Sequence, residues 1–384
     1  MKIVFVSNYY NHHQAPLSEE FFSQTNGNYI FIQTMPMEEE RKLLGWGECL
    51  PSFVIESYKD NETYKRCLDI IYSADVVIVG SAPEKMIHKR IKSNKLTFRY
   101  SERIYKNWKN KLTLPLRFVK YHLENSKNTY LLCASAYAAA DYAKTGNFIG
   151  KAYKWGYFPQ VKEYNDIDEI VNSKVKNSIL WVARLIEFKH PEVAICIAKM
   201  LKDAGYNFDL SLIGNGKLEN QMKSLIETEG LEDCVHMLGA MNPNDVRKYM
   251  EQAQIFLFTS DFNEGWGAVL NEAMNSACAV VASNAIGSVP FLVKNGENGF
   301  IYKNGDIEDL YSKVEYLINN PQETAEIGRN AYKTMFDIWN AKIAAKRFIK
   351  LFESFINGYT DQLFDDGPCS ISNISPYHNE EKTI

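Results

Sequence analysis

The chain has 384 residues, and 46% of them are apolar, which is ordinary for a globular protein with a large core. A chain of this length favours two domains. The net charge of −4 argues against a polyanionic partner such as nucleic acid. The seven cysteines are scattered and form no CxxC pair, which argues against a disulfide framework or a zinc site.

The amino-terminal stretch MKIVFVSNYY contains an apolar run of about five residues, which is too short for a secretory signal. No stretch reaches the roughly 18 consecutive apolar residues of a membrane-spanning helix. We therefore expect a cytoplasmic protein.

The first half of the chain alternates between strand and helix patterns. Short apolar runs that end in polar residues predict buried strands at residues 2–8, 28–34 and 74–83. Residues 128–146 have the pattern of a strand followed by a helix.

A basic stretch occupies Lys85–Lys120, with twelve Lys or Arg residues and with Tyr100, Tyr105 and Trp108 interleaved. A basic, aromatic surface suits an anionic bilayer or a lipid-diphosphate acceptor. The alternative is a solvated helical face. The stretch therefore predicts peripheral contact with the inner face of the plasma membrane. No contact with nucleic acid is expected, because the overall charge is negative and no RNA- or DNA-binding module is recognisable.

The second half repeats the alternation more regularly. Strands are predicted at residues 178–184, 208–216, 234–239, 255–260 and 278–283, and helices at residues 191–205, 217–230, 243–253 and 267–277. Apolar strands separated by helices of this length indicate a parallel sheet covered on both faces. The expected fold class is therefore α/β, with two doubly wound, Rossmann-like domains facing a central cleft.

Domain boundaries follow from the same patterns. We expect a first domain over residues 1–158 and a second domain over residues 159–335. Helical periodicity over residues 331–358 predicts carboxyl-terminal helices that pack back towards the first domain, with residues 336–358 crossing back. The polar residues 359–384 are expected to be loosely attached.

Two acids stand out in an otherwise apolar segment. Glu264 follows the strand at residues 255–260, and Glu272 lies eight positions later in the next helix. Ligands bind at the carboxyl ends of parallel strands, and glycines with a helix N-terminus favour a diphosphate there. Glu264 would then face the reacting group, and Glu272 would accept hydrogen bonds from ribose hydroxyls. The alternative is a pair of acids stabilised by the helix dipole.

Further candidates follow neighbouring strands. Arg184 and Lys189 come after the strand at residues 178–184 and suit a diphosphate, or else belong to a solvated loop. Gly214, Asn215 and Gly216 end the next strand and permit close backbone approach.

These motifs resemble those of the retaining GT-B glycosyltransferases of family 4 over residues 178–306. The resemblance implies that Arg184 and Lys189 hold the donor diphosphate, that Glu264 lies beside the transferred sugar and that Glu272 binds the ribose. It also implies backbone donors from Gly265, Trp266 and Gly267, and a contact of Ala240 with the base. The domain at residues 1–158 would bind the acceptor, and the domain at residues 159–335 would bind the nucleotide sugar. The chain departs from the family at residues 8–16, where a glycine-rich loop is common, and at Phe291, where an acid is common.

Fixed cations and helix-start amides can stabilise a leaving diphosphate without a metal. No metal and no cofactor are therefore expected, although Asp166–Asp168 has the DxD pattern of metal-dependent transferases. His12 and His13 follow the first strand, and one of them could position or deprotonate the acceptor. The alternative is that both are ordinary loop histidines.

The sequence thus predicts a metal-independent, retaining glycosyltransferase. It would move a hexose from a nucleotide sugar, UDP-linked, to a glycan or lipid-linked acceptor in bacterial surface-polysaccharide biosynthesis. Two alternatives stay open: a nucleotide-sugar epimerase or phosphorylase of the same fold, and a non-catalytic nucleotide-sugar-binding protein.

Overall fold

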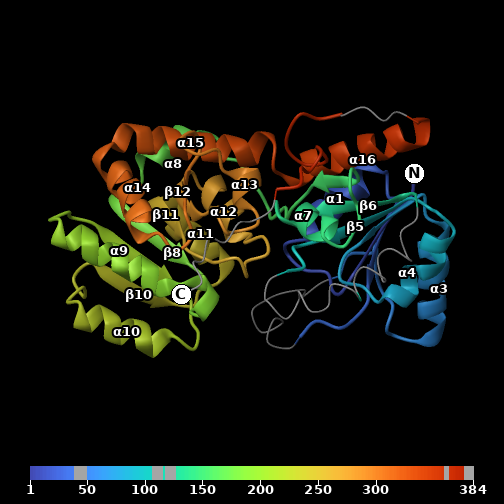
Figure 1. The fold of residues 1–384 in the computed structure, drawn as a ribbon. Helices are drawn as coiled ribbons and strands as arrows, with labels where there is room; N and C mark the ends of the chain where they lie inside the picture. Colours follow the sequence, from blue (N-terminus) through green and yellow to red (C-terminus); the bar gives the residue numbers. More distant parts are fainter. Residues whose placement is uncertain (39–49, 106–115, 117–126, 359–362, 376–384) are drawn as a thin grey trace. The chain divides into compact units, whose positions relative to one another are not determined.

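The computed structural model describes residues 1–38, 50–105, 116, 127–358 and 363–375. The chain divides into two compact units, each built on its own sheet (Figure 1). Unit 1 comprises Met1–Gln160 and Asn340–Ile384, and unit 2 comprises Val161–Trp339. The chain therefore leaves unit 1 once and returns to it at Asn340.

Unit 1 contains a seven-stranded parallel sheet in the order β3-β2-β1-β4-β5-β6-β7. Its strands are β1 (Ile3–Ser7), β2 (Tyr29–Gln33), β3 (Val54–Glu56), β4 (Val76–Val79), β5 (Thr97–Ser101), β6 (Thr129–Cys133) and β7 (Ala152–Lys154). The helices described in this unit are α1 (Ala15–Gln24), α3 (Asn61–Ser73), α4 (Glu84–Lys92), α7 (Ala138–Ala143) and α16 (Ala341–Asn357).

The alternation of side chains along β1 assigns the two faces of this sheet. Val4 and Val6 point to one face, where they join a buried cluster with side chains of α3 and α4. Phe5 points to the other face, and α1 and α16 cover that face through Phe21 and Phe348, whose rings are 5.4 Å apart. The last long helix of the chain, α16, is thus part of the first unit. This agrees with the prediction that the carboxyl-terminal helices pack back towards the first domain.

Unit 2 contains a six-stranded parallel sheet in the order β10-β9-β8-β11-β12-β13. Its strands are β8 (Val175–Val182), β9 (Asp209–Ile213), β10 (Val235–Gly239), β11 (Ala253–Phe258), β12 (Ala279–Ser283) and β13 (Phe300–Tyr302). The helical segments are α8 (Ile167–Asn172), η1 (Glu187–Lys189), α9 (Pro191–Asp203), α10 (Glu219–Thr228), α11 (Pro243–Gln252), α12 (Val269–Asn275), α13 (Val289–Leu292), α14 (Ile307–Asn319) and α15 (Pro321–Asp337).

The core of unit 2 lies between this sheet and α9, α10 and α14, where Trp181, Leu212 and Leu257 are almost completely buried. Helices α11, α12 and α15 contact strands of the same sheet and one another. Helix α12 is shorter than the expected 267–277, because the chain becomes helical only at Val269. Four predicted strands of this unit, β8, β9, β10 and β11, are adjacent in the sheet, so the loops at their carboxyl ends are neighbours.

The helical periodicity of residues 331–358 is interrupted where the chain passes between units. Helix α15 ends at Asp337, and α16 begins at Ala341. Asn340 caps α16, since its side-chain oxygen accepts a 2.9 Å hydrogen bond from the Ile343 amide. The divisions at Gln160 and Trp339 replace the expected boundaries at residues 158 and 335.

The expectation of a loosely attached tail is wrong for residues 363–375. This segment pairs with the edge strand β7 through an antiparallel bridge between Tyr153 and Ile371. Backbone hydrogen bonds of 2.7–2.9 Å join Ala152 and Lys154 to Cys369, Ser370 and Ser372. Polar composition did not reveal this docking, because the interactions are mainly between backbones. Residues 359–362 and 376–384 lie outside the described part of the chain.

The basic stretch is only partly a surface. Arg90 is 1% exposed, and its guanidinium donates to four carbonyl oxygens at the end of α3 and in the segments before β4 and β5, at 2.6–3.1 Å. Arg99 makes a bidentate pair with Glu84, and the Arg103 side chain lies 3.5 Å from the Asp141 carboxylate. The expectation of an outward cationic face is therefore wrong for these three arginines, which balance buried polar groups.

Other parts of this stretch differ. Tyr105, an expected interfacial anchor, is buried. Lys85, Lys89 and Lys92 are exposed on α4. Trp108 and the other residues at 106–115 and 117–120 lie outside the described part of the chain.

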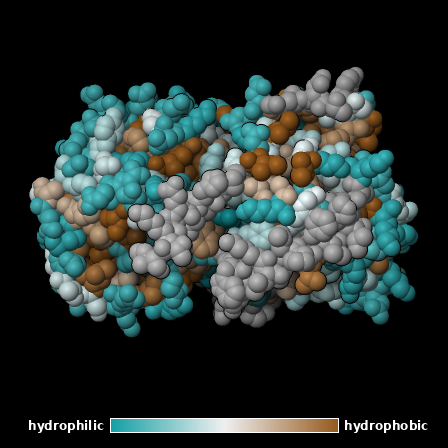
Figure 2. All heavy atoms as spheres, in the orientation of Figure 1, coloured by the Kyte–Doolittle hydropathy of each residue, from teal (hydrophilic) through white to brown (hydrophobic). Residues whose placement is uncertain are grey.

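The visible outer faces are mainly hydrophilic, with smaller apolar patches between polar side chains (Figure 2). Within the described residues, no helix is both long and apolar enough to cross a membrane.

Candidate active site

The carboxyl ends of four adjacent strands carry most of the candidate residues. Arg184 lies two positions after β8, Gly214 follows β9, Ala240 follows β10, and Glu264 comes six positions after β11. Parallel strands end at the same edge of the sheet, which is where open α/β sheets bind ligands. The sequence placed these residues on separate strand ends, and the sheet order makes those ends neighbours.

Lys189 and Glu264 form the most direct contact at this edge. The Lys189 ammonium is ion-paired with the Glu264 carboxylate, and each side chain is only 12% exposed. The Ser260 hydroxyl donates a 3.0 Å hydrogen bond to the same Glu264 oxygen. Sequence reasoning gave the lysine to the diphosphate and the acid to the sugar, and it missed both this contact and Ser260.

Aromatic rings surround the ammonium group. Lys189 Nζ lies 5.1 Å from the centre of the Phe188 ring and 5.9 Å from that of Phe258. Ring faces attract cations, so these contacts help to hold the ammonium group beside Glu264. In contrast, Arg184 is exposed, and no hydrogen bond or ion pair of its side chain is found among the described residues. Arg184 is therefore available to an incoming anion.

The turn after Glu264 folds tightly over that side chain. Gly267 has φ +83°, and a Cβ atom there would lie 2.3 Å from the Phe258 ring and 3.3 Å from Glu264 Cγ. Only glycine fits this conformation and this space. The turn therefore fixes the backbone at Gly267 beside the Glu264 side chain.

Trp266, between these glycines, is an anchor of the turn. Its side chain is fully buried, and Nε1–H donates a 2.9 Å hydrogen bond to Asn271 Oδ1. Its ring is 6.0 Å from Trp339 and 6.3 Å from Phe291, and the latter two rings stack on each other. Phe291 stands where related sequences often have an acid, and the structure gives it a packing role.

The glycines after β9 allow three loops to touch through their backbones. A Cβ atom on Gly214 would lie 1.8 Å from Ala183 O, and one on Gly216 would lie 2.3 Å from Leu185 O. The Gly214 amide donates to Gly239 O at 2.8 Å, and the Leu185 amide donates to Asn215 O at 2.8 Å. These glycines thus bring the loops after β8, β9 and β10 together. Asn215 and Ala240 are exposed beside them.

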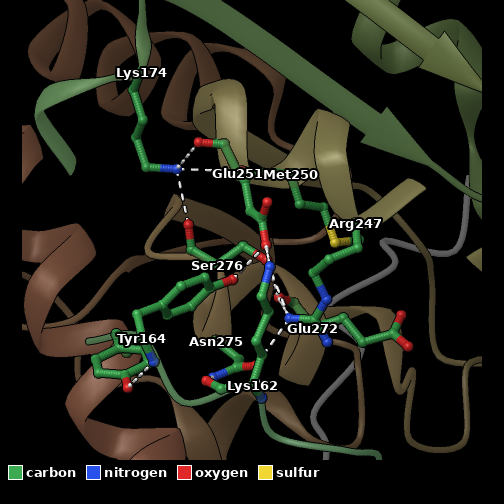
Figure 3. A network of polar contacts seen from close by, with 10 residues as sticks. Lys162, Tyr164, Lys174, Arg247, Met250, Glu251, Glu272, Asn275 and Ser276 are labelled. Atoms are coloured by element: carbon green, nitrogen blue, oxygen red, sulfur yellow. Dashed lines mark hydrogen bonds and ion pairs between the residues drawn. The ribbon is translucent and has the colours of Figure 1, made fainter. Parts of the chain in front are cut away.

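Glu272 lies in the first turn of α12 and is held by a polar network (Figure 3). Arg247 donates to Glu272 O at 3.2 Å, to Asn275 Oδ1 at 2.8 Å and to Ser276 Oγ at 3.1 Å. Burial raises the pKa of the Glu272 carboxyl group, and the nearby charge of Arg247 partly opposes this increase. The carboxylate makes no hydrogen bond to another described residue, so its acceptor capacity is open to a ligand.

A buried lysine supports the same network. Lys174 Nζ donates to the carbonyl oxygens of Met250, Ala253 and Ser276 at 2.8–3.1 Å, joining the ends of α11 and α12 (Figure 3). A cation at helix C-termini stabilises their exposed carbonyl groups. Burial lowers the pKa of Lys174. The position of α12, and with it that of Glu272, therefore depends on two cations that sequence reasoning missed.

The remaining candidates lie elsewhere. Asp166 caps α8 by accepting a 2.8 Å hydrogen bond from the Asp168 amide, and Asp168 pairs with Arg329. The DxD pattern thus has a structural use at a helix start. His12 and His13 belong to unit 1, after β1, where their rings are 3.9 Å apart and burial lowers the pKa of His12.

The family model for glycosyl transferases group 1 matches residues 164–334, which is nearly all of unit 2. Residues 164–334 are a glycosyl transferases group 1 domain. Unit 2 is therefore the group 1 domain of this chain, as the motifs at its strand ends predicted.

Two curated relatives illustrate how far the similarity extends. The amylovoran biosynthesis glycosyltransferase AmsK of Erwinia amylovora is 32% identical over 180 residues, which cover 46% of this chain and 44% of that protein. The N-acetylgalactosaminyltransferase of Campylobacter jejuni that acts on a diphospho-undecaprenol-linked sugar is 27% identical over 256 residues, 63% of this chain and 66% of that protein. The chain thus spans about half the length of the first curated relatives it matches.

The structure of Anabaena HepE in complex with UDP resembles both units. It has a TM-score of 0.69 at 17% identity and covers 92% of this chain and 100% of the Anabaena chain. The likeness confirms the fold class of two Rossmann-like units around parallel sheets, which is that of GT-B glycosyltransferases.

Proposed function

We propose that this protein is a retaining glycosyltransferase that moves a hexose from a UDP-sugar to a glycan or lipid-linked acceptor in bacterial surface-polysaccharide biosynthesis. The observation that carries the proposal is the meeting of Lys189 and Glu264 at the ligand-binding edge of the group 1 domain. The amylovoran relative and the UDP complex of the Anabaena protein support the setting and the nucleotide.

The residues of the site divide the chemistry between them. Transfer requires stabilisation of the charge that develops on the leaving diphosphate. The exposed guanidinium of Arg184 and the ammonium of Lys189 supply fixed positive charge, and the amides at Gly265–Gly267 add backbone donors. These groups would act without a metal, which makes metal independence part of the proposal.

The two acids have different tasks. Glu264 shares its carboxylate with Lys189 and Ser260 beside the position proposed for the transferred sugar. Glu272 would accept hydrogen bonds from the two vicinal hydroxyls of the ribose. A ribose contact is equal in ground and transition states, whereas a contact with the reacting sugar changes during transfer.

Unit 1 supplies the acceptor side in this proposal. His12 and His13 follow β1, and one of them would position or deprotonate the acceptor hydroxyl. Peripheral contact with an anionic membrane at the cytoplasmic face is proposed through the exposed lysines of α4. Lys85, Lys89 and Lys92 are spaced by four and three residues, which places them on one helix face.

The experiment combines a binding screen with a transfer assay. Thermal shifts with UDP-, GDP-, ADP- and dTDP-sugars identify the donor, and NMR of the product of transfer to lipid-linked and glycan acceptors reports the anomeric configuration. Retention with a UDP-sugar is expected. Interconversion of the donor sugar without an acceptor would indicate an epimerase. Release of a sugar 1-phosphate when a glycan is incubated with phosphate would indicate a phosphorylase. Binding without turnover would indicate a non-catalytic protein.

A further inference from the structure

His190 joins the two loops that carry Lys189 and Glu264. Its Nδ1 atom lies 2.8 Å from Glu192 Oε1, and its Nε2 atom lies 3.4 Å from Asp261 Oδ2. Glu192 is in the first turn of α9, whereas Asp261 is on the loop between β11 and α12, three residues before Glu264. The imidazole therefore bridges the loop of the cation and the loop of the acid.

The backbone at His190 is unusual. Its φ and ψ angles of 51° and 55° are in the left-handed region, and the next residue is Pro191. A non-glycine residue in this region is strained and persists only when its surroundings hold it there. A glycine would adopt this conformation without strain. The ring contacts with Glu192 and Asp261 are thus a reason for a histidine at a position whose backbone favours glycine.

Other contacts hold the two loops side by side. The Asp261 amide donates a 3.0 Å hydrogen bond to Phe188 O. The Thr259 hydroxyl lies 2.7 Å from Lys189 O and 3.1 Å from His190 O. These contacts involve the carbonyl groups of Phe188, Lys189 and His190. The histidine ring is therefore one part of a larger junction between the two loops.

The charges at this junction favour an imidazolium. Asp261 Oδ1 already accepts from the Asn263 amide at 2.7 Å, which orients its other oxygen towards the ring. Hydrogen bonds with Asp261 and Glu192 raise the pKa of His190 to about 9, more than its partial burial lowers it. Lys189 is the cation next to it in the chain, and it is paired with Glu264. At neutral pH both ring nitrogens therefore donate to carboxylates.

We propose that His190 is a positioning residue that fixes Lys189 relative to Glu264 through its contact with Asp261. The proposal rests on the proposed function, because it concerns the donor site of that transferase. It makes anion binding at this site depend on the charge of His190.

The expected pH dependence has a definite sign. The pKa of His190 is raised in the folded protein. The stabilisation that the charged imidazole gives to the folded site is therefore complete below the ordinary histidine pKa of about 6.5. It is lost as the pH rises through about 9. UDP affinity should then fall towards that of a protein without the imidazole.

The test compares UDP affinity by calorimetry from pH 6.5 to 10 in the wild type, His190→Gly and Asp261→Asn. Glycine suits the backbone of residue 190, so its variant removes the ring without adding strain. Asparagine keeps the shape of Asp261 and removes its charge. At pH 7 each variant should bind UDP roughly three- to tenfold more weakly, and the ratio to wild type should approach one above pH 9.

A matched control is the pair of His236 and Asp209, which also has a 3.4 Å separation but lies on β10 and β9 at the opposite end of the strands from the loops. His236→Gln should leave UDP affinity unchanged at every pH. NMR titration gives a readout that does not need activity. The His190 imidazole should titrate near pH 9 in the wild type and at lower pH in Asp261→Asn.

A His190 titration near pH 6.5, or an affinity ratio that stays constant with pH, would overturn the positioning role. If UDP does not bind at all while the NMR result holds, the proposed function fails and the contact with Asp261 stands. If the protein transfers sugar but the ratio of UDP affinities between variant and wild type does not change with pH, the proposed function stands and the inference fails.

Discussion

Lys189 and Glu264 are 75 residues apart in the chain, yet they form an ion pair at the carboxyl edge of one sheet. Both are mostly buried, and Ser260 donates to the same carboxylate. A diphosphate that binds Lys189 must compete with Glu264 for its ammonium group. Donor binding and the charge environment of Glu264 are therefore coupled.

This coupling gives Glu264→Gln two effects of opposite direction. The glutamine releases Lys189, so UDP should bind about two- to tenfold more tightly. Turnover should nevertheless fall on the order of 100-fold, because the charge beside the reacting sugar is lost. Calorimetry with UDP and steady-state kinetics measure the two effects. Weaker UDP binding by the variant would show that the ion pair does not compete with the diphosphate.

Removal of either cation should weaken donor binding. Arg184→Ala should weaken the free energy of UDP binding by about 1.5 kcal/mol, since the guanidinium is exposed. Lys189→Ala should weaken it by about 3 kcal/mol, because this variant also leaves Glu264 unpaired beside the phosphates. Lys217→Ala is the control, because Lys217 is an exposed lysine of the same loops that pairs with Glu187. Normal UDP binding by both site variants would remove these residues from the diphosphate site.

The sequence predicted most of the strands and placed the candidate residues of unit 2 after them, because apolar runs and glycines are local signals. It did not predict β3, β5, β7 and β13, or the order of the strands in either sheet. It did not reveal that Trp266 is anchored by Trp339, or that Arg90 and Arg103 turn inward. Those features depend on contacts between distant segments. His190 gave no signal either, since a histidine before a proline does not indicate a left-handed conformation without the structure.

Glu272→Ala should mainly raise the KM for the donor, by about tenfold, and leave kcat within about twofold. The main-chain contact of Arg247 with Glu272 does not need the side chain, so the helix should keep its position. Steady-state kinetics with Glu264→Gln in parallel give the comparison. A large loss of kcat with unchanged KM in Glu272→Ala would exchange the proposed roles of the two acids.

Membrane contact should depend on the exposed lysines of α4. Each lysine near an anionic surface contributes about 1 kcal/mol, and the effect decreases with salt. The wild type should co-sediment with anionic liposomes at low salt, and the triple variant Lys85→Glu, Lys89→Glu, Lys92→Glu should not. The same charge change at the exposed Lys223, Lys248 and Lys333 of unit 2 is the control. Equal sedimentation of all three proteins would favour a soluble acceptor.

The most direct test of the donor site is a calorimetric titration of UDP in the presence of EDTA. The proposal predicts that the wild type binds UDP without a divalent metal and that the double variant Arg184→Ala, Lys189→Ala binds it on the order of 1,000-fold more weakly. Binding that requires Mg²⁺ or Mn²⁺, or equal affinity of the two proteins, would contradict a metal-independent diphosphate site at these residues.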